Sequence, residues 1–235
     1  KGEADIVEEI LRIYGFDQIP LVNIIDKDNK QNVLSSELKS FYKIKRVIAN
    51  QGYLEAVTWS FMDKKAAKII SSNLIEIKNP ISSDLNVMRP SNIPNLLNAV
   101  NLNKSKMINK GKIFEVGPIF GTTLEHKQVN VATAIGYGNI DEGNWNSINN
   151  RFDVFGIKSD LMQILMSLNV PVDNLTYEKI DNKVFHPGKS SSLRIGKNII
   201  ANFGELNPIL LKYLDIQSSV VAFEIFTDTL AQFLN

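Results

Sequence analysis

The chain has 235 residues with 26 basic and 25 acidic side chains, a formal net charge of +1, so no overall field draws it to nucleic acid or an anionic membrane. Its composition, 44% hydrophobic and 22% charged, excludes a disordered or fibrous chain. The lack of cysteine excludes disulfides and thiolate chemistry, and two histidines are too few for a polyhistidine metal site. No apolar run approaches the ~18 residues of a membrane span, so we expect a cytoplasmic protein without membrane contact.

The N-terminal segment predicts a short helix followed by a domain boundary. In residues 4–15 the apolar side chains of Ile6, Ile10 and Ile13 recur at helical spacing. This helix starts within a few residues of the first residue, which suggests a piece of a longer protein. Residues 16–34 are polar and turn-like, and we expect the boundary there.

The rest of the chain predicts alternating helices and strands. A helix begins at Ser35 or Ser36, since Ser is a good N-cap, and ends near Gly52. Residues 53–61 are β-rich and predict a strand. Further strands are expected over 75–77, 112–116, 129–137, 191–195, 199–203 and 220–226, and further helices over 94–107, over 153–168 and after Pro208 and Thr227, with a polar stretch over 145–150. Neighbouring strands separated by turns predict a mainly antiparallel sheet with helices, an α+β fold.

Three carboxylates mark the first predicted helix as a candidate metal site. Asp5, Glu8 and Glu9 lie at positions i, i+3 and i+4, so one helix face presents them over a single turn. Oxygen ligands of this kind suit Mg²⁺. Acidic residues in a first turn also suit the helix dipole without any metal, and the spacing alone leaves both interpretations open.

The other candidate residues form no catalytic constellation. His186 lies in a turn-like segment without a nucleophile or carboxylate beside it in the sequence, which favours a structural role. A local basic run could meet phosphate, although solvated lysines explain it as well. It comprises Lys104, Lys106, Lys110 and Lys112.

Several stretches resemble, in order, the β subunit of bacterial phenylalanyl-tRNA synthetase. Residues 3–20, from Glu3-Ala4-Asp5 to Gln18-Ile19-Pro20, resemble the end of its B5 domain, and residues 52–61 resemble a strand of its class II synthetase-like module. The remaining matches are Asn79-Pro80-Ile81-Ser82, Met88-Arg89-Pro90-Ser91, Pro94-Asn95-Leu96-Leu97, Phe114-Glu115-Val116-Gly117, Phe152-Asp153-Val154-Phe155-Gly156-Ile157-Lys158, His186-Pro187-Gly188-Lys189 and Gly204-Glu205-Leu206-Asn207-Pro208. The resemblance covers essentially the whole chain.

The resemblance implies three parts and a role. Residues 1–20 would be the end of B5, residues 21–34 a linker, and residues 35–235 the B6–B7 module, a class II aminoacyl-tRNA synthetase-like antiparallel sheet flanked by helices. The family's tRNA-binding, editing and anticodon-binding regions would lie outside this fragment. In the family this module has lost catalysis and packs against the α subunit, which uses ATP to activate phenylalanine. The assembly is an (αβ)₂ heterotetramer that attaches phenylalanine to tRNA-Phe.

The resemblance also bears on the candidate residues. Asp5, Glu8 and Glu9 match the last three ligands of a Mg²⁺ site shared with the α subunit, while the first ligand would precede residue 1, so we expect a site that binds Mg²⁺ weakly or not at all. Segments 112–117 and 220–226, where class II motifs would fall, contain no arginine to hold ATP phosphates. We therefore expect the fragment alone to be inactive.

Three functions are compatible with these sequence features. The leading one is a non-catalytic scaffold, a part of phenylalanine–tRNA ligase that binds the α subunit. The alternatives are an autonomous enzyme that activates an amino acid with ATP, and a tRNA-binding module that uses the lysines near residue 110. Two apolar stripes are candidates for the subunit contact, though each is equally a core stripe. They are Leu38/Phe41/Ile44 and Leu161/Ile164/Leu165.

Overall fold

The computed structural model describes residues 2–21, 34–121, 128–139 and 152–233. The chain divides into two compact units, residues 1–34 and residues 35–235. In the first unit, helix α1 (Glu3–Tyr14) is followed by a 3-10 turn (Phe16–Gln18), which confirms the predicted N-terminal helix. No residue of α1 is buried within the chain. Most of the predicted linker lies outside the described residues.

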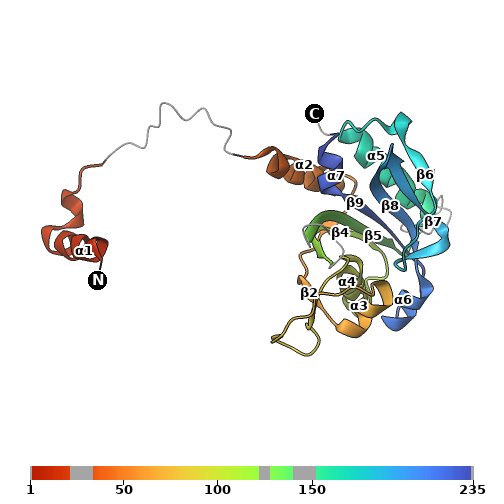
Figure 1. Ribbon diagram of the computed structural model, residues 1–235, viewed down its shortest axis with the longest axis horizontal. Coiled ribbons are helices and arrows are strands. Elements are labelled where there is room, and N and C mark those ends of the chain that lie inside the picture. The colour runs from red at the N-terminus through yellow and green to blue at the C-terminus, as the bar shows by residue number, and fades with distance from the viewer. Residues whose placement is uncertain (1, 22–33, 122–127, 140–151, 234–235) are drawn as a thin grey trace. The chain divides into compact units, whose positions relative to one another are not determined.

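The second unit contains all other elements (Figure 1). Its helices are α2 (Ser36–Asn50), α3 (Lys64–Ile70), α4 (Ile93–Ser105), α5 (Val154–Ser167), α6 (Pro208–Tyr213) and α7 (Thr227–Ala231), with a 3-10 turn at Val172–Asn174. Its strands are β1 (Leu54–Glu55), β2 (Phe61–Met62), β3 (Val87–Met88), β4 (Gly111–Phe120), β5 (Gln128–Tyr137), β6 (Thr176–Glu178), β7 (Phe185–Ile195), β8 (Asn198–Leu206) and β9 (Val220–Phe226).

One seven-stranded sheet organises this unit. Its strand order is β1-β4-β5-β9-β8-β7-β6, and the long strands β4, β5, β9 and β8 lie side by side in Figure 1. Strand β1 pairs with β4 in parallel, and the other pairs of this sheet are antiparallel. Strands β2 and β3 form a separate small antiparallel sheet. The predicted α+β fold with a mainly antiparallel sheet is confirmed.

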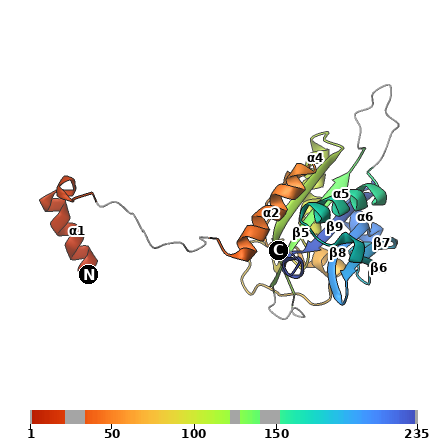
Figure 2. The same cartoon turned by 90° about the horizontal axis from the view of Figure 1, so that it is seen from above.

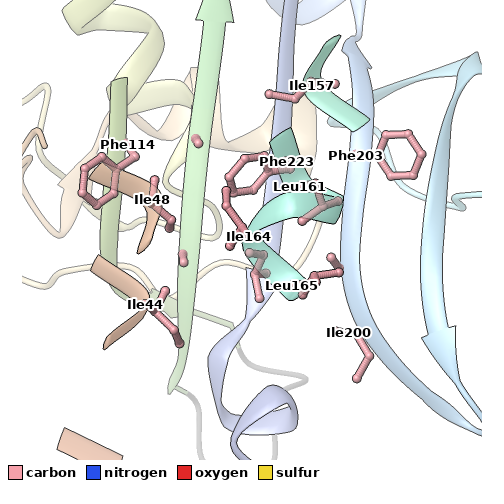
Figure 3. Packing of buried hydrophobic residues seen from close by; sticks show 14 of the residues in the cluster. Ile44, Ile48, Phe114, Ile157, Leu161, Ile164, Leu165, Ile200, Phe203 and Phe223 are labelled. Carbon is pink, nitrogen blue, oxygen red and sulfur yellow. The ribbon is translucent and has the colours of Figure 1, made fainter. Parts of the chain in front are cut away.

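Helices cover both faces of the sheet, because successive strand residues point to opposite sides. Helices α2, α5 and α7 pack on one face, where the larger hydrophobic core lies (Figure 2). Figure 3 shows part of that core, with side chains of α2 and α5 beside aromatic rings of the strands. The labelled residues are Ile44, Ile48, Phe114, Ile157, Leu161, Ile164, Leu165, Ile200, Phe203 and Phe223. Helices α3, α4 and α6 contribute to a second core on the opposite face.

Side-chain caps fix where the two long helices begin. The Ser35 hydroxyl accepts the Leu38 N–H at 3.2 Å, and the Asp153 carboxylate accepts the N–H groups of Phe155 and Gly156 at 3.0 and 2.9 Å. These bonds satisfy amides that have no partner within the helix. The predicted helices from Ser36 and from residue 153 are therefore confirmed to within a residue.

The predicted continuous strand over residues 53–61 is wrong. Only β1 and β2 are strands, and the backbone between them leaves the sheet after the Ala56 N–H donates to the Phe114 carbonyl at 2.7 Å. Beyond that point, side chains bind the backbone in place of a neighbouring strand. The Asn95 amide donates to the carbonyls of Trp59 and Phe61 at 2.6 and 3.3 Å, so the β-forming residues here lie in a bent connection.

Smaller differences concern short elements. The predicted strand over 75–77 is reduced to a single bridge between Glu76 and Val87. Helix α3 and strand β6 were not predicted, because both are too short to show a clear period. Strand β7 begins at Phe185, six residues before the predicted strand. The polar stretch predicted over residues 145–150 lies outside the described residues.

Candidate functional site

Two of the three carboxylates in the acidic turn of α1 have local partners. The Asp5 carboxylate accepts the N–H of Gly2 at 2.8 Å, and Glu9 forms an ion pair with Arg12 at 2.9 Å. Among the residues that the structure describes, no three His, Asp or Glu side chains are grouped to hold a metal ion. The donors are of the type that Mg²⁺ prefers, but the residues present fit only part of a coordination shell. The role of Asp5, Glu8 and Glu9 as ligands stays a prediction.

The other sequence candidates have local partners. The His186 ring accepts a hydrogen bond from the Gly188 N–H through Nδ1 at 3.0 Å, which agrees with a structural role.

Two lysines of the basic run also have local partners. Lys104 donates to the Ser218 hydroxyl at 2.5 Å. Lys112 forms an ion pair with Asp160 at 2.6 Å, to which the Tyr53 hydroxyl also donates. Burial raises the pKa of Tyr53, and the negative charge of the Asp160 carboxylate raises it further.

A row of buried polar side chains crosses the sheet and was missed by sequence reasoning. Five adjacent strands each place one polar residue at the same level, since the residues are direct cross-strand partners. In strand order they are Glu115, Thr133, Glu224, Asn202 and Ser192. Paired residues of neighbouring strands share a face, and this is the face that carries α4. All five are buried.

Arg89 neutralises the first member of this row. Its guanidinium donates from Nη1 to Glu115 Oε1 at 2.7 Å and to Thr58 Oγ1 at 2.9 Å, and from Nε to the Pro118 carbonyl at 2.9 Å. The Thr58 hydroxyl in turn donates to the second Glu115 oxygen at 2.6 Å. Arg89 is 1% exposed and Glu115 is 4% exposed. A buried ion pair persists only when its polar atoms are bonded in this way.

The segment after Arg89 covers the middle of the row. The Ser91 hydroxyl donates to Glu224 Oε1 at 2.7 Å, and the Asn92 amide donates to the Val131 carbonyl and the Thr133 hydroxyl, each at 3.3 Å. Burial raises the pKa of Glu224 to about 7, against the opposing hydrogen bond from Ser91. No cation pairs with Glu224 among the described residues.

This arrangement binds the charged and polar groups of the row to one another and to the segment after Arg89. A catalytic site presents unpaired groups to a cleft, whereas here the charged Glu115 and Arg89 bind each other and the Asn92 side chain, which is fully buried, packs on the row. The sequence carried a signal for Glu115, which stands between apolar residues in a strand pattern. It carried none for its partner, because Arg89 lies 26 residues away.

No described helix combines the length and the apolar composition needed to cross a bilayer.

The structure is similar to two solved structures of pyrrolysyl-tRNA synthetase from Desulfitobacterium hafniense, with TM-scores of 0.63 and 0.62 at 13% identity. Each match covers 97% of this chain, and 71% and 74% of the respective solved chain. At this identity the likeness concerns the fold, and it confirms the predicted class II synthetase-like architecture.

Sequence comparison identifies relatives along nearly the whole chain. The phenylalanine–tRNA ligase β subunit of Rhodospirillum rubrum is 35% identical over 231 residues, which is 97% of this chain and 29% of the relative. The β subunit of Rickettsia typhi is 36% identical over 225 residues, which is 94% of this chain and 27% of the relative. The chain thus spans less than a third of the length of these relatives. A family model described as the phenylalanyl tRNA synthetase beta chain CLM domain matches residues 23–227, and the chain therefore belongs to this family.

Proposed function

We propose that this chain is the non-catalytic class II-like module of a phenylalanine–tRNA ligase β subunit and that it serves as a scaffold for the α subunit. The observation that carries this proposal is the filled sheet face. Arg89, Ser91 and Asn92 bind the buried polar row from within the chain, so ATP and an amino acid would have to displace bonded side chains. ATP is accordingly used by the α subunit, and this chain contributes to ligation through assembly.

The sheet edge at β1 supports a partner contact. Leu54, Val57 and Trp59 lie on or just after this edge strand and are 73%, 87% and 69% exposed. Edge strands with apolar side chains invite pairing with another chain, and an aromatic anchor such as Trp59 is typical of interface hot spots. We place the α-subunit contact here.

The apolar stripes predicted for that contact are core stripes instead. Ile44, Leu161, Ile164 and Leu165 are fully buried within this chain and have no surface left for a partner. Of the six stripe residues, only Leu38 at the start of α2 is exposed.

The acidic turn supports a metal contribution to the same assembly. Asp5, Glu8 and Glu9 are exposed, and they would supply carboxylate oxygens to a Mg²⁺ ion whose other ligands come from water or from elsewhere in the assembly. Bound there, Mg²⁺ would add structural cross-linking rather than chemistry. With three carboxylates alone we expect weak or no binding.

The proposal extends to the complete protein. Residues 1–20 would be the end of B5, residues 21–34 a linker and residues 35–235 the B6–B7 module of a cytoplasmic (αβ)₂ heterotetramer. Such an assembly would bind tRNA-Phe through its full set of domains.

The test is to mix this chain with the cognate α subunit and to measure the mass of the eluted species by size-exclusion chromatography with light scattering. We expect a species heavier than the α subunit by at least one 26.4 kDa chain. Trp59→Ser should weaken the complex at least tenfold, whereas Ile209→Ser, which changes an exposed apolar residue on α6, should not. Separate elution of the two chains at micromolar concentration would contradict the proposal.

A further inference from the structure

A cavity of about 650 Å³ lies on the side of the sheet that carries α5 and takes no part in the buried polar row. It is bounded by the first turns of α5, by β6 and by β7, and its volume is in the range of small-molecule sites. Its floor is apolar and consists of Phe152, Phe203 and Val221, which are all buried.

Two aromatic side chains stand at its rim in solvent. Phe155 of α5 is 78% exposed and Tyr177 of β6 is 51% exposed. Each is far more exposed than the aromatic residues of the floor, and neither is needed by the core. Exposed aromatic rings beside an apolar floor offer flat surfaces for a planar ligand.

One cation at the rim lacks a compensating anion. Lys158 lies one turn after Phe155 on α5, and its Nζ atom is 4.5 Å from the centre of the Tyr177 ring. Within the described residues it forms no ion pair. By contrast, Lys189 pairs with Glu205 at 2.7 Å, and the Asp153 carboxylate caps α5. The free positive charge of the pocket is therefore that of Lys158.

An irregular part of β7 forms the remaining wall of the pocket. The pairing of β7 with β8 changes register between Phe185 and Ser190, and such bulges often adjoin binding sites. Gly204 permits the close approach of the two strands, since a Cβ atom there would lie 2.5 Å from the Ser190 Cα atom. The segment Gly188–Ser191 then lines the cavity with one lysine and two hydroxyl groups.

We propose that this pocket binds a nucleotide, with the base stacked on Phe155 and the phosphate at Lys158, whose ammonium lies over the Tyr177 ring. A bare anion would leave the apolar floor unused, and an uncharged apolar ligand would leave the lysine unpaired. A planar ring joined to an anionic group would cover the apolar floor and would pair with the lysine. Free mononucleotides and unpaired nucleotides of an RNA strand share this chemistry, and the inference does not depend on the proposed role as an α-subunit scaffold.

The test uses this chain and two probes, AMP by titration calorimetry and a fluorescein-labelled hexaadenylate by anisotropy. We expect saturable binding of at least one probe. Binding of AMP alone would identify a free nucleotide as the ligand, and binding of the hexaadenylate alone would identify a strand. Phe155→Ala should weaken binding about 5- to 150-fold, the range for loss of one stacked base. Lys158→Gln should reduce the salt dependence of strand binding by about 0.7 in the slope of log K against log salt.

Matched controls separate this site from general effects. Met166→Ala removes another exposed side chain of α5, and Lys212→Gln removes a lysine of α6. Neither residue lines the cavity, so neither change should alter the affinity, and circular dichroism would check that every variant folds. The proposal is overturned if neither probe shows saturable binding, or if Phe155→Ala binds as well as the parent chain.

Discussion

Replacing Arg89 by methionine tests the buried polar network. The change keeps most of the side-chain volume but removes the charge that faces Glu115 at 2.7 Å. Among the described residues, Glu115 would then keep the Thr58 hydroxyl as its remaining hydrogen-bond donor, with its carboxylate still buried. Removal of one partner from a buried ion pair costs about 3–5 kcal/mol. With a urea m-value of about 2 kcal/mol per M, the unfolding midpoint should fall by about 1.5–2.5 M.

The assay is urea unfolding followed by far-ultraviolet circular dichroism, with two comparisons. The double variant Arg89→Met/Glu115→Leu should regain most of the lost stability, because no charge is left buried without a partner. Lys64→Met breaks the exposed ion pair with Glu76, which lies at 2.6 Å, and should cost at most about 1 kcal/mol. The reasoning fails if Arg89→Met shifts the midpoint by less than about 0.5 M, or if the double variant is no more stable than the single one.

Three further predictions concern single side chains. Burial raises the pKa of Glu224 from 4.5 to about 7, so the folded state keeps a proton that the unfolded state releases, and stability falls as the pH rises across this window. Glu224→Gln should therefore narrow the difference between the urea midpoints at pH 5 and pH 8, and an unchanged difference would refute this assignment. Gly117→Ala would place a Cβ atom 2.7 Å from Arg89 Nη2 and should cost about 1–3 kcal/mol in thermal unfolding, whereas Gly188→Ala, with its nearest contact at 3.7 Å, should be tolerated. Asp153→Ala removes the cap of α5 and should cost about 0.5–2 kcal/mol in urea unfolding, with Asp153→Asn retaining most of the stability.

Elements with a long and regular pattern could be predicted from the sequence. The helix from Ser36 shows both a cap and an apolar stripe. The strands predicted over 129–137 and 220–226 are rich in β-forming residues and lie within a residue of the observed bounds of β5 and β9. Local signals of this kind need no knowledge of the rest of the chain. The family resemblance then supplied the class II synthetase-like architecture, whereas the order of the strands in the sheet was not predicted.

The polar row and the connection after β1 could not be predicted in this way. Glu115 and Arg89 are 26 positions apart, and Ser91 and Glu224 are 133 apart, so no periodicity relates them. Residues 56–60 have the composition of a strand, yet Asn95 and Arg89 bind the Trp59 carbonyl at 2.6 and 3.4 Å. Tertiary hydrogen bonds thereby override a local preference.

The central claim is that the filled sheet face leaves this module without chemistry of its own. The most direct test is ATP–pyrophosphate exchange by the purified, folded chain with phenylalanine, ATP and Mg²⁺. Because exchange requires formation of an aminoacyl adenylate, it is insensitive to nucleotide binding at the α5 pocket. The account predicts exchange at the level of a blank without protein. Exchange above that level that co-elutes with the folded chain would contradict it and would give this module chemistry of its own.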